Sequence, residues 1–284
     1  MKYKTELLRI PCGKRAETLL ILKPNDWRAG DQRTGVLWIH GGGYVTGMKE
    51  MVHMSRSVDL VTRFGAVVVS PGYRLAPFAP YPAALDDCFA ALLYMRSHAA
   101  ALGIRSDQLM AGGESAGGGL CAAVCIRARD TSTVNVAFQM PLYPMLDDRD
   151  TKTSRNNHGR VWNTRRNHFG WRCYLRGQDR SRLSPYAAPA RLNDHAGLPP
   201  AYTFVGDGEP FYAETVQYIE RLRTCGIPAE IDVYHSDLHA FDMLRPREPL
   251  SREAARRFDE RFAYAQTHYF APQSSGTPAG FCSI

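Results

Sequence analysis

Short apolar runs that end at a glycine, a proline or polar residues recur along the chain. They cover residues 36–39, 66–70, 108–112, 134–140, 201–205 and 229–234. Their apolar positions do not alternate strictly with polar ones, which is typical of strands buried on both faces of a parallel sheet. The hydrophobic pattern therefore predicts a sheet of such strands.

Helices are predicted between these strands, at residues 55–64, 82–101, 116–129, 213–225 and 248–267. Pro82 suits a first helical turn, and Gly226 suits a helix end. Because predicted strands and helices alternate, the chain is expected to form βαβ units. The predicted class is α/β, with helices on both faces of a mostly parallel central sheet.

One region breaks this alternation. Residues 147–198 lie between two predicted strands and carry no clean strand pattern. An insertion above the carboxyl ends of the strands would form a small cap. The expected organisation is one domain over residues 1–270 that carries this cap, followed by a flexible tail over 271–284, where Pro, Gly and Ser are frequent.

Composition narrows the class of protein. The 284 residues suit one large domain or two small ones, and no apolar stretch reaches the ~18 residues of a membrane-spanning helix. The basic N-terminus lacks the apolar region of a signal peptide. The seven cysteines are an odd number and form no CxxC pair. We therefore expect reduced thiols and a cytoplasmic protein.

The basic residues of the insertion account for the net charge of +7. Between Arg149 and Arg182 there are ten basic residues and two acidic ones. A basic balance can indicate nucleic acid or an anionic membrane, but a solvated surface is the commoner reason. We expect neither partner.

Residues 113–117 read Gly-Glu-Ser-Ala-Gly and stand between an apolar run and a predicted helix. This is the context of the G-x-S-x-G motif, in which a nucleophilic serine occupies a sharp strand-to-helix turn. The turn requires residues without side chains two positions away on either side, and Gly113 and Gly117 meet that need. A chance glycine-rich turn would match the same short pattern.

Residues 40–44 read His-Gly-Gly-Gly-Tyr and follow the first of these runs directly. Consecutive glycines let backbone N–H groups turn toward a ligand, and acyl transfer needs such donors at the developing oxyanion. An HGGG loop supplies them together with the N–H after the nucleophile, here Ala116. A phosphate-binding loop is the alternative, but its Gly-Lys-Ser/Thr pattern is absent. The two motifs together indicate an α/β-hydrolase.

An acid and then a base should follow the serine in such a fold. His239 lies just past the last predicted strand, and His235, at the end of that strand, competes with it. Asp207 and Glu209 both follow the strand at 201–205. Either carboxylate could orient the imidazole, so the chemistry alone does not choose between them.

At this point the chain resembles the bacterial hormone-sensitive-lipase-like (family IV) esterases of the α/β-hydrolase superfamily. The matching blocks keep the family's order and span residues 36 to about 265; they are 40–44, 70–77 (Ser-Pro-Gly-Tyr-Arg-Leu-Ala-Pro), 81–87, 113–118, 184–187, 198–201, 209–211 and 239–242. The resemblance implies Ser115 as the nucleophile and His239 as the base. It implies the N–H groups of Gly42, Gly43 and Ala116 as the oxyanion donors.

The chain departs from the usual pattern of this family at several positions. Aligning the family's Asp-Pro-Leu-x-Asp-Glu block on Pro210 and Glu214 implies that Glu209 is the acid, in place of the commoner aspartate. Glu114 replaces a commoner aspartate, and Ala240 replaces the usual glycine after the histidine. Only 39 residues precede His40, fewer than relatives usually have. The cap is therefore expected to be small or open and formed mostly by 147–182.

The expected function is a serine carboxylesterase that hydrolyses short-chain acyl esters, with no metal or organic cofactor. The alternatives are a deacetylase or amidase on the same fold, and a non-catalytic protein that binds small molecules. Dimers are common among relatives, so a homodimer is a candidate assembly. The basic insertion adds the hypothesis that substrates carry an anionic part distant from the ester; a solvated cap surface is the alternative.

Overall fold

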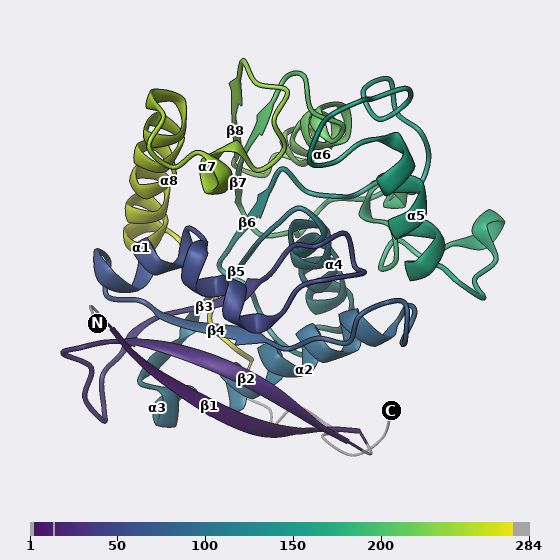
Figure 1. Ribbon diagram of the computed structural model, residues 1–284. Helices are drawn as coiled ribbons and strands as arrows, with labels where there is room; N and C mark the ends of the chain where they lie inside the picture. Colours follow the sequence, from purple (N-terminus) through teal and green to yellow (C-terminus); the bar gives the residue numbers. More distant parts are fainter. Residues whose placement is uncertain (1–2, 14, 275–284) are drawn as a thin grey trace.

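A computed structural model describes residues 3–13 and 15–274 of the protein. Within these residues one eight-stranded sheet has the order β1-β2-β4-β3-β5-β6-β7-β8 (Figure 1). In chain order the strands are β1 (Tyr3–Cys12), β2 (Arg15–Pro24), β3 (Arg33–Ile39), β4 (Val67–Pro71), β5 (Ile104–Glu114), β6 (Phe138–Leu142), β7 (Ala201–Gly206) and β8 (Ala229–Tyr234). From β4 to β8 neighbouring strands are parallel, while β1 and β2 add an antiparallel edge.

Helices cover both faces of this sheet. They are α1 (Ser57–Thr62), α2 (Ala83–Ser97), α3 (Ala99–Leu102), α4 (Ala116–Thr131), α5 (Thr164–Tyr174), α6 (Tyr212–Thr224), α7 (Phe241–Leu244) and α8 (Pro249–His268), with 3₁₀ turns η1 (Lys49–Met54), η2 (Arg180–Arg182) and η3 (Pro189–Arg191). Figure 1 shows α1 and α8 on one side of the sheet and α4 and α6 on the other.

Strand β3 is buried on both faces, which explains why its apolar residues do not alternate with polar ones. Leu37 and Ile39 belong to the core that contains residues of α2, α4 and α6. Val36 and Trp38 belong to the core that contains residues of α1 and α8. Successive side chains of a strand point to opposite faces, so both sets are buried. The predicted α/β class, with a mostly parallel sheet between two helical layers, is confirmed.

Several elements differ from the sequence-based expectation. The hairpin of β1 and β2 was not predicted. Strand β1 is an edge strand that buries only Ile10, whereas β2 carries a buried apolar run, Leu19–Leu22, that the prediction missed. The predicted strand at 134–140 lies instead at Phe138–Leu142. The single helix expected over 82–101 is interrupted at His98, whose φ of −118° and ψ of 23° separate α2 from α3.

The insertion lies between β6 and β7 and contains α5, η2 and η3. Helix α5 was not predicted; its Asn163 cap accepts a hydrogen bond from the N–H of Arg166. All ten basic residues between Arg149 and Arg182 are exposed. The basic character of the insertion is therefore a property of the protein's outer surface.

Part of the predicted tail, 271–284, is among the described residues. The N–H of Ala271 donates to Asp107 O at 2.8 Å, and the Gln273 amide donates to Asn135 O at 2.9 Å. Residues 275–284 lie outside the described part. Among the described residues, every helix falls short of the length and apolar character that a membrane crossing requires. The six cysteines that the structure describes are free thiols.

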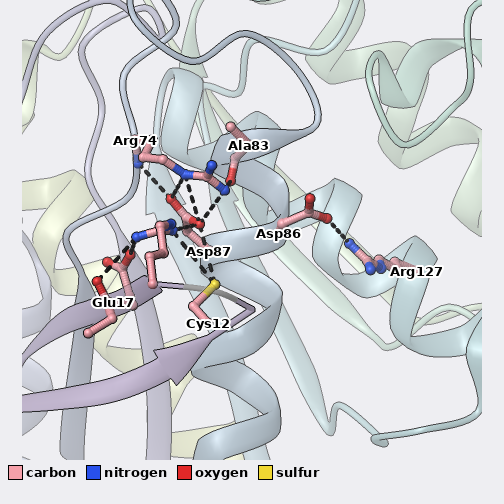
Figure 2. Close-up of polar contacts among 9 residues, drawn as sticks. Cys12, Glu17, Arg74, Ala83, Asp86, Asp87 and Arg127 are labelled. Atoms are coloured by element: carbon pink, nitrogen blue, oxygen red, sulfur yellow. Dashed lines mark hydrogen bonds and ion pairs between the residues drawn. The ribbon is translucent and has the colours of Figure 1, made fainter. Parts of the chain in front are cut away.

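A buried ion cluster joins the N-terminal hairpin to α2 (Figure 2). Asp87 of α2 is fully buried and accepts hydrogen bonds from the backbone N–H of Arg74 at 2.8 Å and from its guanidinium at 2.9 Å. Arg15 at the start of β2 forms an ion pair with the same carboxylate. Asp87 therefore holds the loop after β4 and the sheet edge in one position.

Candidate active site

Ser115 occupies the turn between β5 and α4, with φ of 57° and ψ of −119°. This is a sparsely populated conformation for a residue with a side chain. A Cβ on Gly117 would lie 2.0 Å from the carbonyl oxygen of Ile39, and one on Gly113 would lie 2.4 Å from the same atom. The end of β3 therefore passes so close to the turn that both flanking positions require glycine.

The glycine loop after β3 lies against this turn. A Cβ on Gly41 would be 3.4 Å from Ser115 Cβ. Gly42 has φ of 114° and Gly43 has φ of 60°, which are left-handed conformations that favour glycine. A Cβ on Gly43 would lie 2.0 Å from Cη2 of Trp162, so this side chain of the insertion covers the loop. Ala116 is the first residue of α4, where helical N–H groups lack intrahelical partners.

His239 stands between the serine and a buried carboxylate. Its Nε2 lies 2.9 Å from Ser115 Oγ, and its Nδ1 contacts Glu209 Oε2. The other Glu209 oxygen accepts the N–H of Gly206 at 3.1 Å. The edges of Tyr143 and Phe211 pack on the imidazole, with ring centroids 5.2 and 5.1 Å away. Hydrogen bonds and packing thus fix the imidazole in one orientation.

The structure separates the two acid–base pairs that the sequence left open. Asp207 Oδ2 lies 3.0 Å from His235 Nδ1, and the His235 side chain is 99% exposed. Their hydrogen bond lowers the pKa of Asp207 and raises the pKa of His235. This pair is on the surface, whereas Glu209 and His239 are buried beside Ser115. The three predicted triad residues are brought together from the carboxyl ends of β5, β7 and β8.

Comparison with known proteins identifies the family of the chain. The family described as alpha/beta hydrolase fold matches residues 36–243. The chain belongs to this family.

Several relatives of this hydrolase are named as esterases. Esterase LipI of Mycobacterium tuberculosis H37Rv is 31% identical over 224 residues, which cover 78% of the chain and 70% of LipI. Hormone-sensitive lipase of Ictidomys tridecemlineatus is 36% identical over 110 residues, which cover 39% of the chain and 14% of that lipase. A solved structure titled bacterial heroin esterase has a TM-score of 0.87 at 31% identity and covers 93% of this chain and 85% of its own. The protein is a carboxylic ester hydrolase of the hormone-sensitive-lipase-like group, as its motifs indicated.

His40 of the hydrolase supports the glycine loop without titrating near neutral pH. Its ring stacks on Tyr73 with centroids 4.1 Å apart, and its Nδ1 lies 2.8 Å from Gly41 O. Burial lowers the pKa of His40 to about 4, so the imidazole is neutral. The Tyr73 hydroxyl donates to His40 O at 3.0 Å. The sequence alone gave no role for Tyr73 of the 70–77 block. The structure shows that Tyr73 supports His40 and, through it, the glycine loop.

Two buried carboxyl groups adjoin the turn of Ser115. Glu114 accepts a hydrogen bond from Trp38 Nε1 at 2.9 Å, which ties the end of β3 to the end of β5. Asp242 accepts the Tyr143 hydroxyl at 3.0 Å and lies 3.5 Å from the Arg56 guanidinium. Burial, and secondarily Asp242, raise the pKa of Glu114 to about 8. Within the described residues, no group of three or more His, Cys, Asp or Glu could hold a metal ion.

Glu114→Gln should flatten the pH dependence of stability between pH 5 and 8. The folded protein keeps the Glu114 proton up to a pKa of about 8, whereas the ordinary pKa of a glutamate is 4.5. The folded state therefore binds more protons in this window, and the free energy of unfolding falls as pH rises, by up to about 1.4 kcal/mol per pH unit. Glutamine keeps the acceptor for Trp38 and removes this titration. Urea unfolding of both proteins from pH 5 to 8 gives the free energy of unfolding at each pH. If this free energy changes with pH equally in the two proteins, the raised pKa of Glu114 is contradicted.

Ala240→Gly should stabilise the hydrolase. Ala240 has φ of 58° and ψ of 39°, a left-handed conformation that strains an alanine. Relief of that strain exceeds the added freedom of glycine in the unfolded chain, for a net gain of roughly 0.5–1 kcal/mol. The matched control Ala263→Gly, inside helix α8, should instead lose about 1 kcal/mol. Equal losses in the two variants, measured by urea unfolding, would show that position 240 is not strained.

Proposed function

We propose that this hydrolase is a serine carboxylesterase that cleaves short-chain acyl esters with Ser115, His239 and Glu209. The observation that carries the proposal is the continuous path from a buried carboxylate through one imidazole to a serine hydroxyl, with 2.9 Å between Nε2 and Oγ. The strained turn of Ser115 supports the same role, because nucleophilic serines occupy such turns in this fold.

Each group has a separate task in this mechanism. Nε2 of His239 takes the proton of Ser115 as Oγ attacks the ester carbonyl carbon, and Glu209 stabilises the imidazolium that forms. The N–H groups of Gly42, Gly43 and Ala116 hold the tetrahedral oxyanion. Collapse expels the alcohol, which receives the proton from His239. Water activated by His239 then hydrolyses the acyl-enzyme and restores the free serine.

The preference for short acyl chains is inferred from Trp162. Its ring covers Gly43, next to the proposed oxyanion donors, and its centroid lies 6.4 Å from that of Phe211. Aromatic groups on this side restrict the space beside the reacting carbonyl. A small acyl group fits such a site better than a long chain.

Hydrolysis of p-nitrophenyl esters from acetyl to palmitoyl tests the proposal. We expect kcat/KM to be highest between acetyl and butyryl and to fall by roughly 100-fold or more at palmitoyl. A p-nitroanilide of the same short acyl group tests the amidase alternative. Turnover of the anilide faster than the ester, or of palmitoyl faster than acetyl, would contradict the assignment.

We also infer that the protein is a single domain over 1–270 with a cap at about 147–198. Its substrate is inferred to be a small-molecule ester. The free thiols of the described cysteines support a reducing, cytoplasmic location. Light scattering coupled to gel filtration tests the candidate homodimer.

A further inference from the structure

Helix α5 of the insertion has two chemically different faces. Its inner residues are buried; they are Asn167, Gly170, Trp171 and Tyr174. Arg165, Phe169 and Arg172 are exposed and spaced four and three residues apart, so they form one stripe along the outer face. Phe169 is 49% exposed, so part of its ring faces solvent between the two arginines.

The guanidinium groups of Arg165 and Arg172 have no acidic partner among the described residues. Of the two acidic groups closest in sequence, Asp150 pairs with His168 of the same helix at 2.7 Å, and Asp179 accepts from the Ser181 hydroxyl at 2.7 Å. Within residues 3–13 and 15–274, no carboxylate lies within 4.0 Å of the guanidinium of Arg165 or Arg172. Several other exposed arginines of the protein, such as Arg256 on α8, do have acidic partners.

The surface around the stripe is hollowed on both sides. Two shallow hollows of about 490 and 570 Å³ are each lined by Asn163, Arg165 and Arg172. Phe169 lines the first hollow, and His158 and His168 line the second. The stripe therefore presents two cations, an aromatic ring and room beside them for bulky anionic groups.

We propose that the outer face of α5 docks on an anionic lipid bilayer. The guanidinium groups of Arg165 and Arg172 would bind lipid phosphates, and the ring of Phe169 would enter the interface between headgroups and acyl chains. Small soluble anions would engage the arginines but give no reason for an exposed phenylalanine between them. Such docking is weak, reversible and strongly dependent on salt.

The same helix adjoins the candidate active site from its inner face. A Cβ on Gly170 would lie 2.8 Å from Gly43 O. Docking through α5 would thus bring the glycine loop close to the lipid phase, where apolar esters concentrate. The docking itself requires no catalytic role of Ser115, so it can be tested independently of the proposed function.

Co-sedimentation with vesicles tests the proposal. The wild-type protein should bind phosphatidylcholine vesicles that contain one third phosphatidylglycerol at low salt, and neither pure phosphatidylcholine vesicles nor the anionic ones at high salt. Arg165→Glu/Arg172→Glu should weaken binding at least about tenfold. The control Arg247→Glu/Arg252→Glu changes the net charge equally at exposed positions on and just before α8 and should stay within about twofold. Wild-type hydrolysis of p-nitrophenyl acetate in both variants shows that they are folded.

Phe169→Ala separates a bilayer from other polyanions. It should weaken vesicle binding by about threefold or more, while a short DNA duplex, held by phosphate contacts alone, would be bound equally by wild type and variant. Absence of wild-type binding to anionic vesicles at low salt overturns the proposal. So does an equal loss in the α8 control, or a Phe169→Ala protein that binds the anionic vesicles as tightly as the wild type does.

Discussion

Ser115→Ala should lower kcat for p-nitrophenyl acetate by about 10⁵-fold or more and remove the burst of p-nitrophenol. Alanine removes the Oγ that lies 2.9 Å from His239 Nε2, so no acyl-enzyme can form. The backbone of the turn stays in place, because alanine has the same Cβ as serine. Rapid-mixing absorbance at 400 nm measures both the burst and the steady rate.

A residual rate is still expected, since the proposed oxyanion donors remain. Residues that act as one unit are not additive, so adding His239→Ala to Ser115→Ala should cost less than tenfold further. Thermal unfolding near the wild-type midpoint is the control for folding. A Ser115→Ala protein that still releases product at the wild-type rate would refute the serine mechanism.

Glu209→Gln should lower kcat by about 10⁴-fold with little change in KM. The amide keeps the size of the side chain but loses the charge that would stabilise the His239 imidazolium. It can also hold the imidazole in the wrong tautomer, because an amide N–H would face Nδ1. The matched variant Asp207→Asn removes a carboxylate two residues away that pairs with exposed His235 and accepts the N–H of Ser236 at 3.1 Å. We expect its kcat to stay within about twofold of wild type.

Steady-state kinetics of the two variants on one short ester decides between the carboxylates. A large loss in Asp207→Asn with a small loss in Glu209→Gln would reverse the assignment of the acid. Losses of equal size would instead indicate that both substitutions disturb the loop after β7.

The body of the fold was predictable because its strands are buried on both faces. The run 36–39 carries an apolar residue at every position, which is typical of a strand in a parallel sheet between two helical layers. Strand β1 at the N-terminal edge escaped prediction for the opposite reason, although its partner β2 does carry a buried apolar run, Leu19–Leu22. Strand β1 buries little, so its pairing with β2 is determined by backbone hydrogen bonds that leave no apolar pattern.

The candidate site was predictable where a backbone constraint selects glycine. Gly113, Gly117 and Gly42 each stand where a side chain would collide with a carbonyl oxygen, and such constraints are visible as motifs. The choice between Asp207 and Glu209 depends on how a loop turns after β7, which no local pattern reveals. The cover by Trp162 and the buried pair of Glu114 and Asp242 are contacts across long sequence separations, so they required the structure.

The ion cluster at Asp87 has a consequence for anyone who shortens or fuses this protein. Deleting the first two strands would remove Arg15 and leave a buried carboxylate with fewer cations, a change that is strongly destabilising. The damage would extend inward, because Arg74 is adjacent to Tyr73, which stacks on His40 beneath the glycine loop. Trimming the hairpin should therefore reduce turnover as well as stability. A fusion partner or purification tag is better joined in a way that leaves this hairpin intact.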